Sequence, residues 1–233
     1  DNISPLPAPG STLYGNLKIH NDMLMPQLDD RLRTVRVLLP ANYHRDKQQR
    51  FPVLYMFDGQ NAFDRQSASY GKEWMLDEIL KTQQDAGIHS GVIVVGIDAS
   101  AKSPCERRSE YSPWSWSGAG CGNIPGRGDD TAQFIIKTLK PFIDKNYRTK
   151  KGRNDTSVGG SSMGGLIALY SILEYPEIFS SSFSLSIAAI KEHGGQALVD
   201  YIHQLSPRSN INVYVDIGDK EGMQGIRKEL DFC

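Results

Sequence analysis

The chain has 233 residues and a mass of 25.9 kDa, and 39% of its residues are hydrophobic and 23% charged. This length can bury a core without disulfide or metal staples, and the composition is that of an ordinary globular protein. Twenty-six Lys and Arg residues against 27 Asp and Glu residues leave a formal charge of -1, so no global positive field exists for a polyanionic backbone. We therefore expect no nucleic-acid partner.

The longest apolar runs, at residues 92–95 and 166–170, fall far short of a bilayer span, which predicts a soluble chain with no membrane span. The three cysteines have neither zinc-ligand spacing nor a CxxC pair, so no metal or thioredoxin-type site is expected. The chemistry predicted below implies no organic cofactor either. Cys105 and Cys121 either form a disulfide in an oxidising compartment or stay as thiols. The compartment stays open between the cytoplasm and the periplasm or exterior, because Asp1 also suits a mature terminus.

Strands and helices are predicted to alternate after residues 1–30, which we assign to an N-terminal extension. Alternation of Val35, Val37 and Leu39 indicates the first strand, and continuous apolar runs indicate strands buried on both faces. The predicted strands are 32–39, 53–57, 92–95, 156–159, 182–187 and 211–217. The predicted helices are 72–84, 164–173, 196–205 and one from Asp130 or Thr131 to Ile143, bent or split at Pro141.

This order predicts an α/β protein. Strands separated by helices pair in parallel through right-handed crossovers, which gives a doubly wound, mostly parallel sheet with helices on both faces. Because no repeat or linker divides the chain, we expect residues 1–233 to form a single domain. Ligands of such sheets bind beyond the carboxyl ends of the strands, so the candidate site lies at the turns after Phe57, Gly159 and Ile217.

The sharpest motif is Gly-Ser-Ser-Met-Gly-Gly, which starts at Gly160 and joins a predicted strand to a predicted helix. A nucleophilic serine on such a strained turn needs almost no side chain two residues before and two residues after it. Gly160 and Gly164 meet that need around Ser162 but not around Ser161. Ser162 is therefore the candidate nucleophile. The alternatives for the motif are a phosphate-cradling turn and a plain tight turn.

Two backbone N–H groups are candidates for an oxyanion hole. The N–H of Met163 falls in the first turn of the predicted helix, where it has no helical partner. The second donor would come from the segment 52–64, in which a buried strand runs into Asp58-Gly59, and we assign it to the N–H of Gln60. For this segment alone, an ordinary turn at a common turn dipeptide is the alternative.

Residues 100–129 contain Ser-Pro pairs and several glycines and predict a long loop over the site. A structureless insert of this length is usually functional. Trp114 and Trp116 in this loop are candidate substrate-binding residues, as the apolar wall of a pocket or a stacking platform for a sugar. The alternative is that both side chains only tie the loop to the surface of the domain.

Four segments together resemble the putative esterase family of the α/β-hydrolase fold: residues 52–64, 108–113, 139–148 and 160–179. That family includes siderophore esterases, feruloyl and acetyl-xylan esterases, S-formylglutathione hydrolase and the mycolyltransferases. The resemblance spans residues 30–222. It implies an α/β-hydrolase fold, a small-molecule ester as substrate, Ser162 as nucleophile, and the N–H groups of Gln60 and Met163 as oxyanion donors.

In the family that the chain resembles, the triad acid follows a late strand in a Gly-x-x-Asp/Glu pattern. The spacing from Gly218 selects Glu221, with Asp219 as the alternative. The family's histidine comes later still, after one more helix and strand. The sequence from Glu221 to Cys233 contains no histidine. We therefore expect the C-terminal strand and the histidine to be missing from the chain as given and supplied from beyond it, with His193 as the weaker alternative.

These features predict a serine esterase that hydrolyses a carboxylic ester through an acyl-enzyme intermediate. Ser162 attacks, the N–H groups of Gln60 and Met163 hold the oxyanion, and Glu221 orients the histidine. An acyltransferase on the same scaffold is one alternative, since only the acyl acceptor differs. The other is a noncatalytic α/β-hydrolase-like protein that binds a ligand after losing its histidine. The sequence leaves the oligomeric state open.

Overall fold

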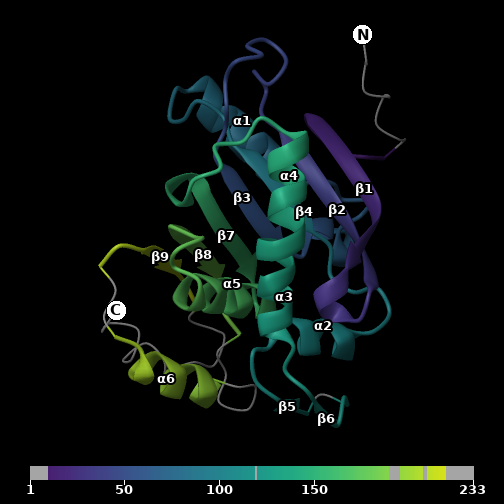
Figure 1. Ribbon diagram of the computed structural model, residues 1–233. Helices are drawn as coiled ribbons and strands as arrows, with labels where there is room; N and C mark the ends of the chain where they lie inside the picture. Colours follow the sequence, from purple (N-terminus) through teal and green to yellow (C-terminus); the bar gives the residue numbers. More distant parts are fainter. Residues whose placement is uncertain (1–9, 119, 189–194, 207–208, 219–233) are drawn as a thin grey trace.

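The computed structural model describes residues 10–118, 120–188, 195–206 and 209–218. Their main feature is a seven-stranded sheet in the order β1-β2-β4-β3-β7-β8-β9 (Figure 1). The strands are β1 (Asn16–Met25), β2 (Arg31–Leu39), β3 (Val53–Phe57), β4 (Ile93–Ile97), β7 (Thr156–Ser161), β8 (Ser181–Leu185) and β9 (Asn212–Val215). From β4 to β9 all neighbouring strands are parallel, whereas β1 and β2 are antiparallel to their neighbours.

Helices cover both faces of this sheet, as the sequence predicts (Figure 1). They are α1 (Leu76–Asp85), α2 (Pro104–Tyr111), α3 (Gly128–Phe134), α4 (Lys140–Asn146), α5 (Met163–Glu174) and α6 (Gly195–Gln204). Successive residues of β3 point to opposite faces. Tyr55 lies in the larger apolar cluster with residues of α3, α4 and α5, whereas Met56 lies in a smaller cluster against which α1 packs. None of the described helices is both long and apolar enough to cross a membrane.

The predicted helix around Pro141 is present but divided. A π-helical turn, Ile135–Leu139, joins α3 to α4, and Pro141 lies in the first turn of α4. Proline has no N–H to donate to the preceding turn, so a change of helical hydrogen bonding just before it is expected.

The assignment of residues 1–30 to an extension is wrong for residues 16–25. These residues form β1, which pairs with β2 at the edge of the sheet. The strand escapes a pattern search because it has no buried alternating face: Met25 is its one buried residue. An edge strand that is largely solvated on both faces carries no period-2 signal.

The prediction of a loop over residues 100–129 is also wrong in part. The segment contains α2 and a hairpin of β5 (Trp116–Ser117) and β6 (Asn123–Ile124). Ser103 caps α2 by accepting a hydrogen bond from the N–H of Glu106 at 3.1 Å. The buried residues of α2 include Ser109 and Glu110, so the helix has no apolar stripe for a sequence search to find. A disulfide joins Cys105 to Cys121 and ties the start of α2 to the hairpin.

Candidate active site

Ser162 lies between β7 and α5 in a backbone conformation that side chains rarely adopt. Its φ and ψ are 59° and -122°, and the residue is exposed. The surrounding chain holds it there: its N–H donates to the carbonyl of Leu185 at 3.0 Å, and its carbonyl accepts from the N–H groups of Gly165, Leu166 and Ala188 at 3.0 to 3.1 Å. Such strain persists only where the fold fixes it, and it concentrates at functional sites.

The turn is possible because β7 and α5 approach closely at Gly160. A Cβ atom added to Gly160 would lie 2.4 Å from the carbonyl oxygen of Gly164, well inside van der Waals contact. The glycine spacing around Ser162 thus has the steric cause that the sequence predicts.

Gly160→Ala is expected to destabilise the protein, because the backbone of α5 cannot retreat from the new methyl group. Overpacking of this kind costs about 2–3 kcal/mol, which lowers the melting temperature by about 4–12 °C in a chain of this size. Gly152→Ala is the matched control, since a Cβ atom there meets nothing within 4 Å and the φ of Gly152 is -71°. Thermal unfolding of both variants tests this, and equal melting temperatures would contradict it.

The first turn of α5 presents free backbone donors beside Ser162. No acceptor pairs with the N–H of Met163 in the part of the chain that the structure describes. The first N–H groups of a helix have no intrahelical partner and carry the positive end of its dipole. The start of α5 therefore offers an anion a directed hydrogen-bond donor next to an exposed hydroxyl group.

A second turn lies beside the first, because β3 and β7 are adjacent parallel strands. It begins with Asp58, whose φ and ψ are 56° and 45°, and continues as the 3-10 turn Gly59–Asn61. The carbonyl of Gln60 accepts from the Ser67 hydroxyl at 2.8 Å, and its side-chain oxygen accepts from the N–H of Ala99 at 2.9 Å. Its own N–H meets no acceptor among the described residues.

The sequence search missed one charged pair at this turn. Asp58 is 3% exposed, and Arg107 of α2 binds both of its carboxylate oxygens, with Nε–Oδ1 at 2.7 Å and Nη2–Oδ2 at 2.6 Å. The N–H of Asp58 donates to the hydroxyl of Tyr111 at 3.2 Å. Recognising α2 from its Ser103-Pro104 start would have placed Arg107 and Tyr111, four residues apart, on one helical face.

The two tryptophans of the 100–129 segment have structural contacts. Trp116 is 3% exposed and packs under the guanidinium group of Arg108, so it has almost no surface left for a substrate. Trp114 is half-buried and packs edge-to-face against Tyr170 and at a tilt against Tyr201, which joins this segment to α5 and α6. The predicted role in substrate binding remains a prediction for Trp114, and burial argues against it for Trp116.

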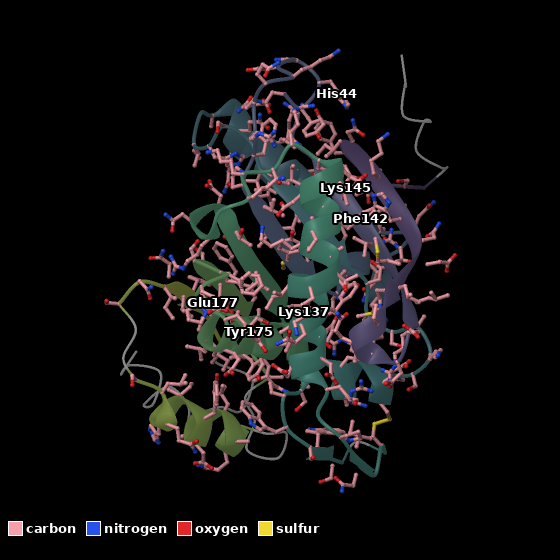
Figure 2. All side chains as sticks on the ribbon, viewed as in Figure 1. His44, Lys137, Phe142, Lys145, Tyr175 and Glu177 are labelled. Atoms are coloured by element: carbon pink, nitrogen blue, oxygen red, sulfur yellow. A yellow bond between two sulfur atoms is a disulfide. The ribbon has the colours of Figure 1, made fainter. Side chains whose placement is uncertain are left out.

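No hydrogen bond joins Ser162 to any of the four histidines within the described ranges. His20 lies on β1 and forms a hydrogen bond with the Tyr147 hydroxyl at 2.6 Å, and His203 is exposed on α6. His44 and His89 line a cavity beside α1. Figure 2 places His44 at the end of the molecule opposite α2 and the hairpin.

The predicted acid Glu221, its alternative Asp219 and His193 lie outside the described residues. The described chain runs through β9 to Gly218, so it reaches the side of the sheet at which the parallel strands β7, β8 and β9 have their carboxyl ends. Asp216 lies on this side, where its carboxylate accepts a hydrogen bond from the N–H of Ser186 at 2.6 Å. Among the described residues, no group of three or more His, Cys, Asp or Glu side chains is arranged to hold a metal ion.

Comparison with known proteins gives a consistent set of relatives. A family model described as "Putative esterase" matches residues 27–230. The uncharacterised protein YbbA of Bacillus subtilis is 27% identical over 194 residues, which cover 82% of this chain and 70% of that protein. An endo-1,4-beta-xylanase/feruloyl esterase of Xylanibacter ruminicola is 25% identical over 204 residues, 86% of this chain but only 24% of the relative.

Solved structures agree on the fold. The BES protein from Bacillus cereus superposes with a TM-score of 0.68 at 19% identity, over 100% of this chain and 84% of that one. The enterobactin esterase FES from Shigella flexneri gives 0.65 at 18% identity, over 87% of this chain and 46% of that one. The fold is therefore that of the α/β-hydrolase-like esterases.

Proposed function

Because the chain belongs to the putative esterase family, we propose that it hydrolyses a carboxylic ester through an acyl-enzyme intermediate formed on Ser162. Membership of this family supports ester hydrolysis in general terms. The observation that carries the finer proposal is the conformation of Ser162, an exposed serine at φ 59° and ψ -122° at the start of a helix. In this proposal the turn is a nucleophile elbow, the strained strand-to-helix turn that exposes a nucleophilic serine.

In the first step the Ser162 oxygen bonds to the ester carbonyl carbon while its proton passes to a base. The base in this proposal is a histidine oriented by Glu221, which would also stabilise the imidazolium that forms. The carbonyl oxygen becomes an oxyanion. Collapse of this tetrahedral intermediate breaks the bond to the alcohol, which leaves with the proton from the histidine, and water then releases the acid by the same route in reverse.

The oxyanion hole in this proposal consists of the N–H groups of Met163 and Gln60. Both lack an acceptor among the described residues, and they come from the turns that follow the carboxyl ends of the adjacent strands β3 and β7. Donors that are already fixed in place need no reorganisation as charge develops, and loss of one such donor costs roughly 10²–10³ in turnover. The dipole of α5 adds to the stabilisation at Met163.

Titration with a fluorophosphonate during p-nitrophenyl acetate hydrolysis tests this function. We expect active protein to lose all hydrolysis on binding one equivalent of reagent, because the reagent phosphonylates the serine that the ester acylates. Hydrolysis that survives one equivalent would contradict an acyl-enzyme on a single serine. Ser162→Ala protein treated in parallel controls for hydrolysis and reagent loss that do not depend on this serine.

A further inference from the structure

The turn that carries Gln60 is held by a buried charge that the esterase mechanism does not use. Asp58 is 3% exposed and sits in the left-handed region at φ 56°, directly before Gly59 and Gln60. Its carbonyl accepts the N–H of Asn61 at 2.9 Å, which closes the 3-10 turn. A carboxylate is costly to bury without a partner, so something must hold it there.

We propose that Arg107 is a positioning residue for the oxyanion hole: its two-pronged ion pair with Asp58 fixes the turn that presents the Gln60 N–H and neutralises a carboxylate beside the start of α5. This inference rests on the proposed function. Arg107 does not touch the ester in this account, and it acts through Asp58.

The hydrogen-bond geometry favours a fixed turn. The guanidinium group binds both carboxylate oxygens at 2.6 to 2.7 Å, and one helical turn later the Tyr111 hydroxyl accepts the N–H of Asp58. One face of α2 therefore holds Asp58 by its side chain and by its main chain. Two parallel N–H···O bonds restrict orientation as well as distance, which a single contact cannot do.

The helix that carries Arg107 is itself anchored at several points. The disulfide of Cys105 lies two residues before Arg107. Glu110, which is buried, binds Arg31 at 2.8 Å and Arg33 at 2.7 Å, both on β2. Because α2 is fixed to β2 and to the hairpin, it is a rigid support. Its contact with Asp58 can therefore hold the turn in place.

The charge of Asp58 also bears on the oxyanion. A Cβ atom added to Gly164, in the first turn of α5, would lie 3.1 Å from Oδ2 of Asp58. A bare carboxylate at this place would oppose an oxyanion bound to the neighbouring N–H groups. Burial alone lowers the pKa of Arg107, but the hydrogen bonds and the charge of Asp58 outweigh burial and raise its pKa. Arg107 therefore stays charged across the pH range of an assay.

Arg107→Ala is expected to lower kcat about 100-fold and to change KM less than about threefold, because it displaces an oxyanion donor without touching the bound ester. Arg107→Lys keeps the positive charge but cannot bind both carboxylate oxygens as the guanidinium group does. Its kcat should therefore lie between those of the wild type and of Arg107→Ala. Adding Asp58→Asn to Arg107→Ala should raise kcat about tenfold over the single variant, because the unpaired charge is gone. A merely structural arginine would change the amount of folded protein in both variants and leave the kcat of the folded protein unchanged.

Lys140→Ala is the matched control. Lys140 pairs with Asp144 on α4 at 2.8 Å, with both side chains 14% exposed, and it lies outside the proposed machinery. We expect its kcat to equal that of the wild type. An Arg107→Ala kcat equal to that of this control, or a loss that appears mainly in KM, would overturn the positioning role. If Arg107→Ala does not fold, the double variant, which buries no unpaired charge, carries the same comparison with the wild type.

Amide hydrogen exchange separates this inference from the proposed function. Exchange over residues 58–63 should rise at least about tenfold in Arg107→Ala and stay unchanged in Lys140→Ala, whether or not the protein hydrolyses esters. Unchanged exchange there would overturn the positioning role. Faster exchange in a form of the protein that carries the histidine but shows no Ser162-dependent hydrolysis would leave the turn positioned by Arg107 and would refute the esterase.

Discussion

Replacing Ser162 with alanine in catalytically active protein is expected to lower kcat by about a millionfold, the loss found when the nucleophile of a working triad is removed. Alanine and serine meet the same steric strain at φ 59°, so the turn itself should persist. The measurement is kcat for p-nitrophenyl acetate, with circular dichroism to check the fold.

Ser161→Ala is the control for this prediction. Ser161 is the last residue of β7 and pairs in register with Leu185. Its side chain is half-buried, whereas Ser162 is exposed. We expect Ser161→Ala to keep kcat within about tenfold of the wild type, since it leaves the hydroxyl and both oxyanion donors in place. A loss that follows Ser161 in place of Ser162 would contradict the assignment of the nucleophile.

Glu221→Gln is expected to lower kcat by about 10⁴-fold in active protein, because an amide cannot hold the imidazole in the required tautomer or stabilise its charged form. This loss should be smaller than that of Ser162→Ala, since the serine and the base both remain. The prediction rests on the spacing of Glu221 from Gly218.

Asp219→Asn is the paired variant, since Asp219 is the other acid that closely follows Gly218 in the sequence. It should leave kcat within about tenfold of the wild type. If Asp219→Asn is inactive and Glu221→Gln is active, the carboxylate that orients the base is Asp219. Measuring kcat of both variants with one substrate preparation makes the comparison direct.

The sequence predicts the parallel part of the sheet because buried strands carry a strong local signal. The continuous apolar runs that became β3 and β4 can be recognised without knowing their neighbours. The turn at Ser162 is predictable for a related reason. The steric requirement for its glycines involves residues only four positions apart, since a Cβ atom at Gly160 would collide with the backbone of Gly164.

The elements that the sequence does not predict depend on contacts made far along the chain. β1 is an edge strand without a buried stripe, and α2 buries charge where most helices bury apolar side chains. Glu110 looks like a surface residue until Arg31 and Arg33, nearly 80 positions earlier, are seen beside it. The pair of Arg107 and Asp58 is invisible for the same reason. Hydrophobic periodicity and turn residues can be read from a short stretch of sequence, whereas a buried ion pair depends on tertiary packing between distant residues.

Ser162 is expected to form the covalent intermediate, and peptide mass spectrometry after fluorophosphonate treatment is the sharpest test of this. The two serines of the motif are adjacent, so the fragment ions must separate Ser161 from Ser162. We expect a single adduct on Ser162 that is absent in Ser162→Ala. An adduct on Ser161 or Ser157, or one that persists in Ser162→Ala, would contradict it.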